Sequence, residues 1–318
     1  MLTYIVRRLI HAFVVIVIVS IAVFILIRLL PGDPIEMLIS QTQLTETTPE
    51  MIEALRHDKG LDRPLPVQYA DWFVQMIRGD FGTSIMRNFD IGKEIGNRVT
   101  VTLMIGLSAF VIGLVLGPIL GIVSAVRRGK FVDNLVTVIA NIGITAPAFW
   151  VGILLIFFFG VRLKLLPIYG YTLPWDDFWM SFKQSLMPIF VTALGPIATT
   201  ARQTRSSVLE VMSEDYIRTA WAKGLNERKV ILRHIIKNSL LPVVTLQGTM
   251  LRMVVGGSVV VETVFVIPGM GKMMVDAMLS HDYPVVQAVT VIMTLVVVLS
   301  SLIVDLLYGW LDPRIQYD

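Results

Sequence analysis

The chain has 318 residues, of which 55% are hydrophobic and only 16% are charged. A soluble domain of this size requires a more polar surface, and the apolar residues fall into long uncharged runs, so the composition indicates a polytopic membrane protein. The net charge of +3 is too small for a nucleic-acid-binding surface. The absence of cysteine excludes disulfides, cysteine metal sites and thiol chemistry.

Six stretches qualify as membrane-spanning helices, which need about 20 mostly apolar residues. They are predicted at 9–27, 99–126, 136–161, 186–201, 240–261 and 285–304. The third contains Asn141 and Pro147, which could mark a discontinuity or a packing site. The fourth is short, and Pro188 and Pro196 are predicted to break or kink it.

The second predicted span carries glycines at four-residue spacing, Gly113, Gly117 and Gly121. Small residues at this spacing line one helix face and allow another helix to approach closely. We expect this face to pack within the chain rather than to mediate dimerisation.

The segments between the spans set the topology. Segment 33–98 is polar and more acidic than basic, with amphipathic helices predicted at 49–57 and 66–78. The basic clusters at 7–8, 127–130 and 202–237 all fall on one side of a six-span arrangement, which the positive-inside rule makes cytoplasmic. Both termini are therefore predicted to be cytoplasmic, with segment 33–98 and the loop 266–283 outside.

A polar segment, 213–242, interrupts the apolar runs late in the chain. Ser213 is predicted to cap a helix over 214–223, and Gly224 fits the position just after its end. Asn226 is predicted to cap a second helix that continues to the end of the segment.

One face of the first of these helices is formed by Ile217, Ala220, Trp221 and Gly224. Because Ala220 and Gly224 are small, the helix is interpreted as presenting a low-profile surface to another protein's groove. Docking on DNA is disfavoured by the position between two spans. A basic helix resting on anionic lipid remains partly compatible with the pattern, and a solvated loop is the third alternative.

The sequence contains no pattern for catalysis or for ATP binding. The stretch PGMGK at 268–272 lacks both the earlier glycine and the following Ser/Thr of a phosphate-binding loop. The four histidines are scattered, and no metalloprotease motif occurs. We therefore expect no catalytic residues, no metal site and no cofactor bound by this chain.

Segment 204–244 resembles the cytoplasmic EAA loop of ABC-importer permeases, and most closely the dipeptide/oligopeptide branch. The nominal Glu-Ala-Ala reads Arg218-Thr219-Ala220. Trp221 and His281 stand where this branch usually has arginine. The other stretches that resemble this branch are 1–33, 79–85, 260–271, 282–287 and 305–315.

The resemblance implies an all-α membrane protein with the type I ABC importer fold. Its parts would be a first transmembrane helix at 1–32, an extracytoplasmic loop region at 33–98, and a permease core at 99–318 with a cytoplasmic EAA loop at 202–240. Within that loop, the helix between spans four and five would be the coupling helix. The residues implied to contact an ATPase are Glu214, Asp215, Tyr216, Arg218, Thr219, Ala220, Trp221, Lys223 and Gly224.

The implied assembly lies in the inner membrane of a prokaryote. A second permease chain would complete a heterodimer, two cytosolic ATPase subunits would hold ATP and magnesium, and an extracytoplasmic binding protein would deliver the substrate. The implied substrates are di- and oligopeptides, with nickel, metal chelates or glutathione as alternatives. A stand-alone secondary transporter is disfavoured, because the sequence has no clear internal repeat and few acids within its spans.

Three polar residues within the spans are candidates for the translocation path: Arg252, Glu262 and Asn141. A charge in a membrane span is costly unless it is paired or faces a cavity. Arg252 is interpreted as a contact for an anionic substrate group, as a structural ion pair with Glu262 or Asp305, or as a side chain that snorkels to the membrane interface. For Glu262 a gating or packing role, and for Asn141 a packing role, are the alternatives.

Overall fold

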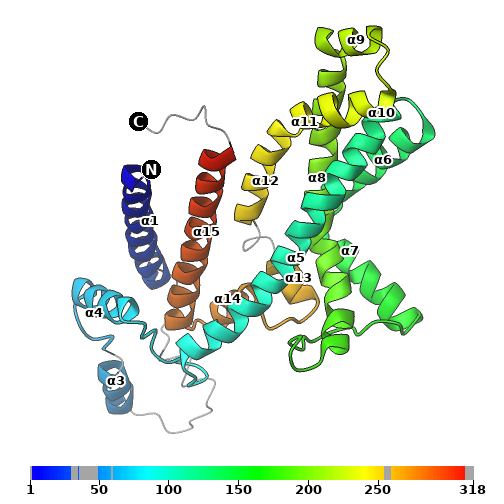
Figure 1. Ribbon diagram of the computed structural model, residues 1–318. Helices are drawn as coiled ribbons and strands as arrows, with labels where there is room; N and C mark the ends of the chain where they lie inside the picture. Colours follow the sequence, from blue (N-terminus) through cyan, green and yellow to red (C-terminus); the bar gives the residue numbers. More distant parts are fainter. Residues whose placement is uncertain (1, 30–34, 36–48, 59, 254–258, 312–318) are drawn as a thin grey trace. The chain divides into compact units, whose positions relative to one another are not determined.

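The computed structural model describes residues 2–29, 35, 49–58, 60–253 and 259–311, with side chains at 6–29, 35, 50–57, 60–251 and 259–304. Regular structure over these ranges is helical (Figure 1). The α-helices are α1 (Leu2–Leu29), α3 (Pro49–Asp58), α4 (Leu65–Ile77), α5 (Ile91–Val126), α6 (Phe131–Thr145), α7 (Ala148–Leu155), α8 (Phe178–Met212), α9 (Asp215–Ala222), α10 (Glu227–Val230), α11 (Ile236–Ser239), α12 (Leu241–Met253), α13 (Val259–Val264), α14 (Met270–Leu279) and α15 (Tyr283–Leu311). Two π-helical segments are η1 (Ile156–Arg162) and η2 (Ile231–Ile235).

Three helices in these ranges are long and apolar enough to cross a membrane: Val6–Leu29 of α1, all of α5, and Tyr283–Val304 of α15. They confirm the first, second and sixth predicted spans. The third predicted span is bent by 106° between α6 and the helix that continues from α7 into η1. The bend lies at Pro147, because the residue before a proline is driven out of helical geometry, and Ala146 is extended there.

The fourth predicted span differs from the structure. Helix α8 runs without interruption over 35 residues, so the predicted break at Pro188 and Pro196 is wrong. Prolines persist in such helices where neighbouring helices and hydroxyl side chains satisfy the freed backbone groups. Helix α8 also continues into the polar sequence beyond residue 201.

The fifth predicted span corresponds to α12 and α13, and residues 254–258 between them lie outside the described residues. By length and composition, only the three helices above and the bent pair qualify as spans within the described ranges. The count of six spans therefore stays a prediction.

The chain divides into two compact units. One holds the described residues of Met1–Val101 and Pro268–Leu299, and the other holds those of Thr102–Ile267 and Ser300–Ile315. The core of the first unit is built from the inward faces of α1, α5, α14 and α15. Its buried members are Ile27, Ile91, Ile95, Met270, Met273, Ala277, Tyr283, Val285, Val286, Ala288 and Val289.

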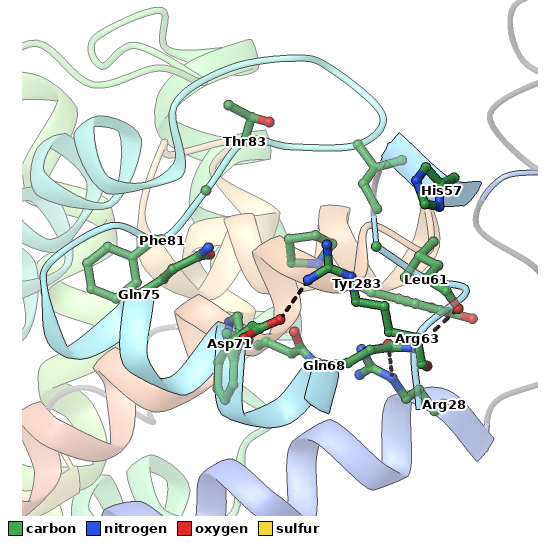
Figure 2. A pocket seen from close by; sticks show the side chains of 16 residues that line it. Arg28, His57, Leu61, Arg63, Gln68, Asp71, Gln75, Phe81, Thr83 and Tyr283 are labelled. Atoms are coloured by element: carbon green, nitrogen blue, oxygen red, sulfur yellow. Dashed lines mark hydrogen bonds and ion pairs between the residues drawn. The ribbon is translucent and has the colours of Figure 1, made fainter. Parts of the chain in front are cut away.

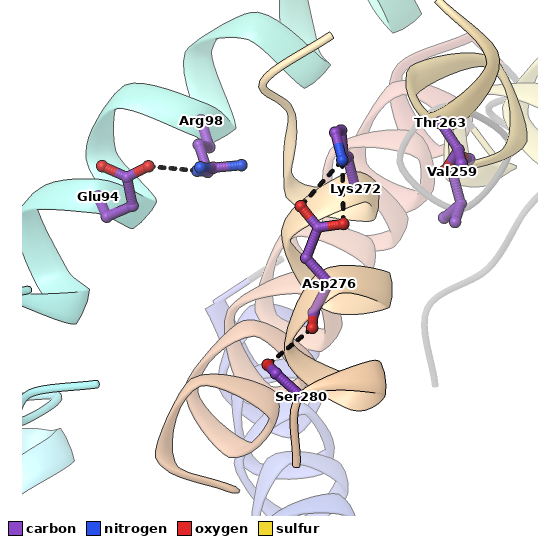
Figure 3. Close-up of polar contacts among 7 residues, drawn as sticks. All are labelled: Glu94, Arg98, Val259, Thr263, Lys272, Asp276 and Ser280. Carbon is purple, nitrogen blue, oxygen red and sulfur yellow. Dashed lines mark hydrogen bonds and ion pairs between the residues drawn. The ribbon is translucent and has the colours of Figure 1, made fainter. Parts of the chain in front are cut away.

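The predicted loop 266–283, which belongs to the first unit from Pro268 onward, contains the ten-residue helix α14. Lys272 Nζ donates to both carboxylate oxygens of Asp276 at 2.9 Å within this helix (Figure 3). At its end, the buried carboxylate of Asp282 accepts hydrogen bonds from Ser84 Oγ and from the backbone N–H of Ile85. Two stretches almost 200 residues apart in sequence are thereby joined.

The predicted amphipathic helices at 49–57 and 66–78 are confirmed as α3 and α4. Helix α4 packs on α1 through an aromatic cluster in which the Phe24 and Tyr69 rings meet edge-on, with centroids 5.3 Å apart. Arg28 Nη2, at the end of α1, donates to Gln68 Oε1 at 2.9 Å (Figure 2).

The glycine face of α5 packs on α8 within the second unit. A Cβ at Gly113 would lie 2.8 Å from Pro196 Cβ, one at Gly117 would lie 2.5 Å from Thr200 Cβ, and one at Gly121 would lie 2.5 Å from the backbone oxygen of Ala201. No side chain fits at these distances. The predicted intramolecular packing is confirmed, and it brings two helix backbones into direct contact.

Candidate functional site

The polar segment forms two helical pieces separated by a turn, as predicted. Helix α9 ends before Gly224, whose φ of +73° is the left-handed geometry that glycine adopts without strain. Asn226 Oδ1 caps α10 by accepting from the Arg228 backbone N–H at 3.0 Å, which confirms the predicted cap.

The N-terminal cap of α9 was predicted wrongly. Its capping position is Glu214, whereas Ser213 ends α8 and donates from Oγ to the Glu210 carbonyl at 2.6 Å. The polar segment thus begins at the C-terminal cap of a long helix. Only a short turn separates α8 from α9, so α9 is attached almost directly to a helix of the second unit.

One face of α9 is seated in the chain's own core. Ile217 is fully buried and Ala220 is 7% exposed. They belong to a buried cluster in the second unit whose other members are Ala125, Val208, Val230 and Ile235. Trp221 is 40% exposed and Gly224 is also exposed, so only half of the predicted face is buried. Ala220 therefore packs α9 against the rest of the chain and does not form part of an exposed docking surface.

The opposite side of α9 is free of the core and polar. The side chains of Asp215 and Arg218 are 94% and 75% exposed, and Arg218 Nη1 lies 3.3 Å from Asp215 Oδ1. Tyr216 is exposed and accepts a hydrogen bond at Oη from Asn238 Nδ2 at 3.0 Å. Helix α9 projects beyond the end of α8 (Figure 1). The result is a short, well-seated helix that presents charged groups and one large aromatic side chain.

A buried ion pair ties the helices beneath α9 together. Asp133 is 3% exposed at the start of α6, and its two oxygens accept from Arg205 Nε at 2.7 Å and Nη2 at 2.9 Å. Ser124 Oγ and the Gly129 backbone N–H donate to the same carboxylate. This network joins α5, α6, α8 and the basic turn at 127–130.

Sequence reasoning missed this network. The available signal was a lone acid, Asp133, immediately after a basic cluster and at the start of an apolar run. Its partner Arg205 was counted only as one of several loop cations. The two residues are 72 positions apart in the sequence, so their pairing could be predicted only from the packing of α6 against α8.

The structure does not gather the three candidate path residues. Glu262 is fully buried and accepts from Thr102 Oγ1 at 2.7 Å, whereas Asn141 is exposed on α6. Arg252 lies in α12, but its side chain is outside the described residues, as is that of Asp305. The alternative packing role is the one that the geometry of Glu262 fits.

A second buried polar contact in the same unit was not predicted. Gln247 Nε2 of α12 donates to Thr200 Oγ1 of α8 at 2.8 Å, and both side chains are buried. Within the side chains that the structure describes, no group of three or more His, Cys, Asp and Glu residues could hold a metal ion.

Comparisons with known proteins cover nearly the whole chain. A sequence profile described as "Binding-protein-dependent transport system inner membrane component" matches residues 117–317. A second profile, for the N-terminal part of membrane components of binding-protein-dependent transport systems, matches residues 1–87.

Full-length relatives match as well. A probable peptide ABC transporter permease protein of Sinorhizobium fredii is 37% identical, over 99% of both chains. A putative peptide permease protein of Brucella suis is 39% identical over 99% of both chains, and the glutathione transport system permease protein GsiC of Salmonella typhimurium is 37% identical over 100% of both.

A solved structure supports the fold. An inward-facing structure of the MetNI methionine ABC transporter matches with a TM-score of 0.55 and 19% identity, covering 69% of this chain and 96% of that one. This likeness concerns the arrangement of helices alone.

Proposed function

Because the chain belongs to the family of binding-protein-dependent transport system inner membrane components, we propose that it is the permease subunit of an ATP-driven importer of small peptides. Several full-length relatives are named as peptide permeases, and another as a glutathione permease. Glutathione is itself a small peptide, so both names support the same substrate class. Metal chelates remain the alternative cargo.

The proposed topology has six spans in the inner membrane, with both termini in the cytoplasm. Segment 33–98 forms the extracytoplasmic region after the first span, and 99–318 forms the permease core with its EAA loop at 202–240. The basic clusters support this orientation through the positive-inside rule. A similar second permease chain completes the path across the membrane, and an extracytoplasmic binding protein delivers the peptide.

Helix α9 is the proposed coupling helix, which docks on one of two cytosolic ATPase subunits that bind ATP and magnesium. The observation that carries this proposal is its packing: Ile217 and Ala220 fix the helix to the permease, while the rest of its surface stays open. The proposed contact residues are Glu214, Asp215, Tyr216, Arg218, Thr219, Trp221, Lys223 and Gly224. The lack of a phosphate-binding loop in the sequence agrees with ATP hydrolysis by a partner.

Movement of α9 reaches the membrane through the helices to which it is fixed. Helix α8 continues almost directly into α9, and the glycine contacts with α5 and the Asp133–Arg205 pair bind α5, α6 and α8 into one body. Closure of the ATPases would shift this body as a unit and change which side of the membrane the path faces. Arg252, Glu262 and Asn141 are retained as proposed path residues. Glu262 would first have to leave Thr102 before it could meet a substrate.

Two substitutions on the exposed face of α9, a charge reversal and the removal of an aromatic side chain, test the docking on the ATPase subunits. We expect Arg218→Glu and Trp221→Ala each to weaken association with the ATPase subunits about tenfold or more, because exposed aromatic and arginine side chains dominate many interfaces. Peptide uptake should fall together with this association. The measurements are co-purification of the ATPases with the tagged permease and uptake of a labelled dipeptide.

Arg228→Glu is the matched control, since Arg228 is an exposed arginine on the neighbouring α10. It should leave both readouts near the wild-type level. All three variants should insert into the membrane and unfold at the wild-type temperature, because none of these side chains is buried. Wild-type ATPase association in Arg218→Glu and Trp221→Ala would contradict the assignment of α9.

A further inference from the structure

The first unit contains a cavity of about 440 Å³ that the proposed coupling mechanism does not use. This volume lies within the range of about 300–1,000 Å³ that is usual for small-molecule sites. Side chains from α1, α4, α15 and the segment 79–85 line it (Figure 2). Its wall is rich in hydrogen-bonding side chains.

Two of the lining side chains carry buried hydrogen-bond donors that are not satisfied. Trp72 Nε1 and Gln287 Nε2 are both inaccessible to water and have no hydrogen-bond partner in the described part of the chain. Gln287 as a whole is only 4% exposed. A buried donor without an acceptor destabilises the protein by about 1–3 kcal/mol. Two such donors around one cavity leave two hydrogen bonds unmade among the described residues.

Among the described side chains of the cavity wall, one cation has no acidic partner. Arg63 Nη1 is paired with Asp71 Oδ2 at 3.0 Å. Arg28, in contrast, donates to the amide oxygen of Gln68 and the carbonyl of Phe24, and its Cζ lies 3.4 Å above the Phe24 ring. All of these described partners are neutral.

The other titratable side chains on the wall are Tyr283 and His57, and His57 is already hydrogen-bonded. Its Nδ1 lies 2.6 Å from Asp62 Oδ2, and this hydrogen bond lowers the pKa of the Asp62 carboxyl below its ordinary value. His57 and Asp62 therefore satisfy each other. The unpaired charge of Arg28 and the unsatisfied N–H donors of Trp72 and Gln287 together favour a negatively charged hydrogen-bond acceptor.

We propose that this cavity binds the C-terminal carboxylate of a short peptide. A carboxylate has two oxygens that accept several hydrogen bonds. It can neutralise Arg28 and, once the Trp72 and Gln287 side chains rotate their N–H groups into the cavity, satisfy those donors as well. The identity of the ligand as a peptide rests on the proposed function, whereas the preference for a carboxylate rests on the cavity. The site belongs to the first unit, and the candidate path residues belong to the second.

Removing each orphaned donor tests the site with little risk to folding. Gln287→Met keeps the length of the side chain and Trp72→Phe keeps an aromatic ring of smaller size. Each deletes an N–H group that has no described partner in the unliganded chain. Trp179→Phe, at an exposed tryptophan of the second unit, is the control. The full-length chain in lipid nanodiscs is titrated with L-alanyl-L-alanine and with its C-terminal amide, and binding is followed by saturation-transfer NMR.

We expect saturable binding of alanyl-alanine and about tenfold weaker binding of the amide, since one charged acceptor is lost. Gln287→Met and Trp72→Phe should each weaken binding of alanyl-alanine about tenfold, while Trp179→Phe should not change it. Equal binding of the two ligands, absence of saturable binding to the wild-type chain, or wild-type affinity in both cavity variants would each overturn the proposal.

Uptake of labelled alanyl-alanine by cells that carry the complete transporter separates this inference from the proposed function. Uptake without carboxylate-dependent binding to the chain would refute the cavity site and leave the importer assignment intact. Carboxylate-dependent binding without peptide uptake would support the site and count against the importer.

Discussion

Replacing Gly121 with alanine is expected to destabilise the chain by about 1–3 kcal/mol, the usual effect of inserting a methyl group into a close-packed contact. The new Cβ would lie 2.5 Å from the Ala201 backbone oxygen and 2.6 Å from Thr204 Cβ. A backbone oxygen within a helix cannot swing aside, so α5 and α8 would have to separate. The measurement is the free energy of unfolding of the purified chain in detergent, together with its level in the membrane.

Gly96→Ala is the control on the same helix. Nothing lies within 4 Å of a Cβ at Gly96, so the substitution should stabilise α5 by about 0.5–1 kcal/mol through the higher helix propensity of alanine. The two variants make the same chemical change in one helix with opposite expected signs. If Gly121→Ala were as stable as Gly96→Ala, the direct contact between the backbones of α5 and α8 would be refuted.

Breaking the buried pair should have the largest effect on stability. We expect Asp133→Asn to lower the free energy of unfolding by about 3 kcal/mol, the lower end of the range for a broken buried pair. The lower end applies because the Arg205 side chain is 32% exposed and partly solvated, whereas that of Asp133 is only 4% exposed. The amide would also weaken the hydrogen bonds from Ser124 and Gly129.

A double-mutant cycle with Arg205→Gln isolates the interaction, since residues in one network couple by about 0.5–3 kcal/mol. Asp276→Asn is the control, because the Lys272–Asp276 pair lies within a single helix and its carboxylate side chain is 33% exposed, against 4% for Asp133 (Figure 3). It should change stability by less than about 1 kcal/mol. Strictly additive effects of Asp133→Asn and Arg205→Gln would show that the pair contributes nothing of its own.

The sequence was most informative where a pattern is local. Hydropathy located α1, α5 and α15, and the spacing of Gly113, Gly117 and Gly121 predicted a packing face because small residues at every fourth position lie on one side of a helix. The turn at Gly224 follows from the same local chemistry, since its positive φ favours glycine.

Features that depend on contacts between residues far apart in the chain could not be predicted from the sequence. The uninterrupted course of α8 through Pro188 and Pro196 depends on neighbouring helices, which propensity does not include. Helical periodicity placed Trp221 on the same face as Ala220, yet the buried cluster has room for only one edge of α9. The Asp133–Arg205 pair likewise required the packing of α6 on α8.

These observations also explain why the candidate site and the fold are linked. A coupling helix transmits force only if it is fixed to the helices that move, and α9 is fixed through Ile217 and Ala220 to a cluster that includes residues of α5 and α8. The variants at Gly121 and Asp133 therefore test the packing that holds α5, α6 and α8 together. Those at Arg218 and Trp221 test the contact of α9 with the ATPase subunits. We expect the first pair to reduce stability and the second pair to reduce docking alone.

Transport by the chain in defined vesicles tests the central claim most directly. The purified permease is reconstituted in liposomes alone, and then with its partner permease, the ATPase subunits and the binding protein, and uptake of a labelled dipeptide is followed. The account predicts no uptake by the chain alone under a proton or sodium gradient, and uptake by the full assembly only with ATP. Gradient-driven uptake by the chain alone would contradict it and identify a stand-alone secondary transporter.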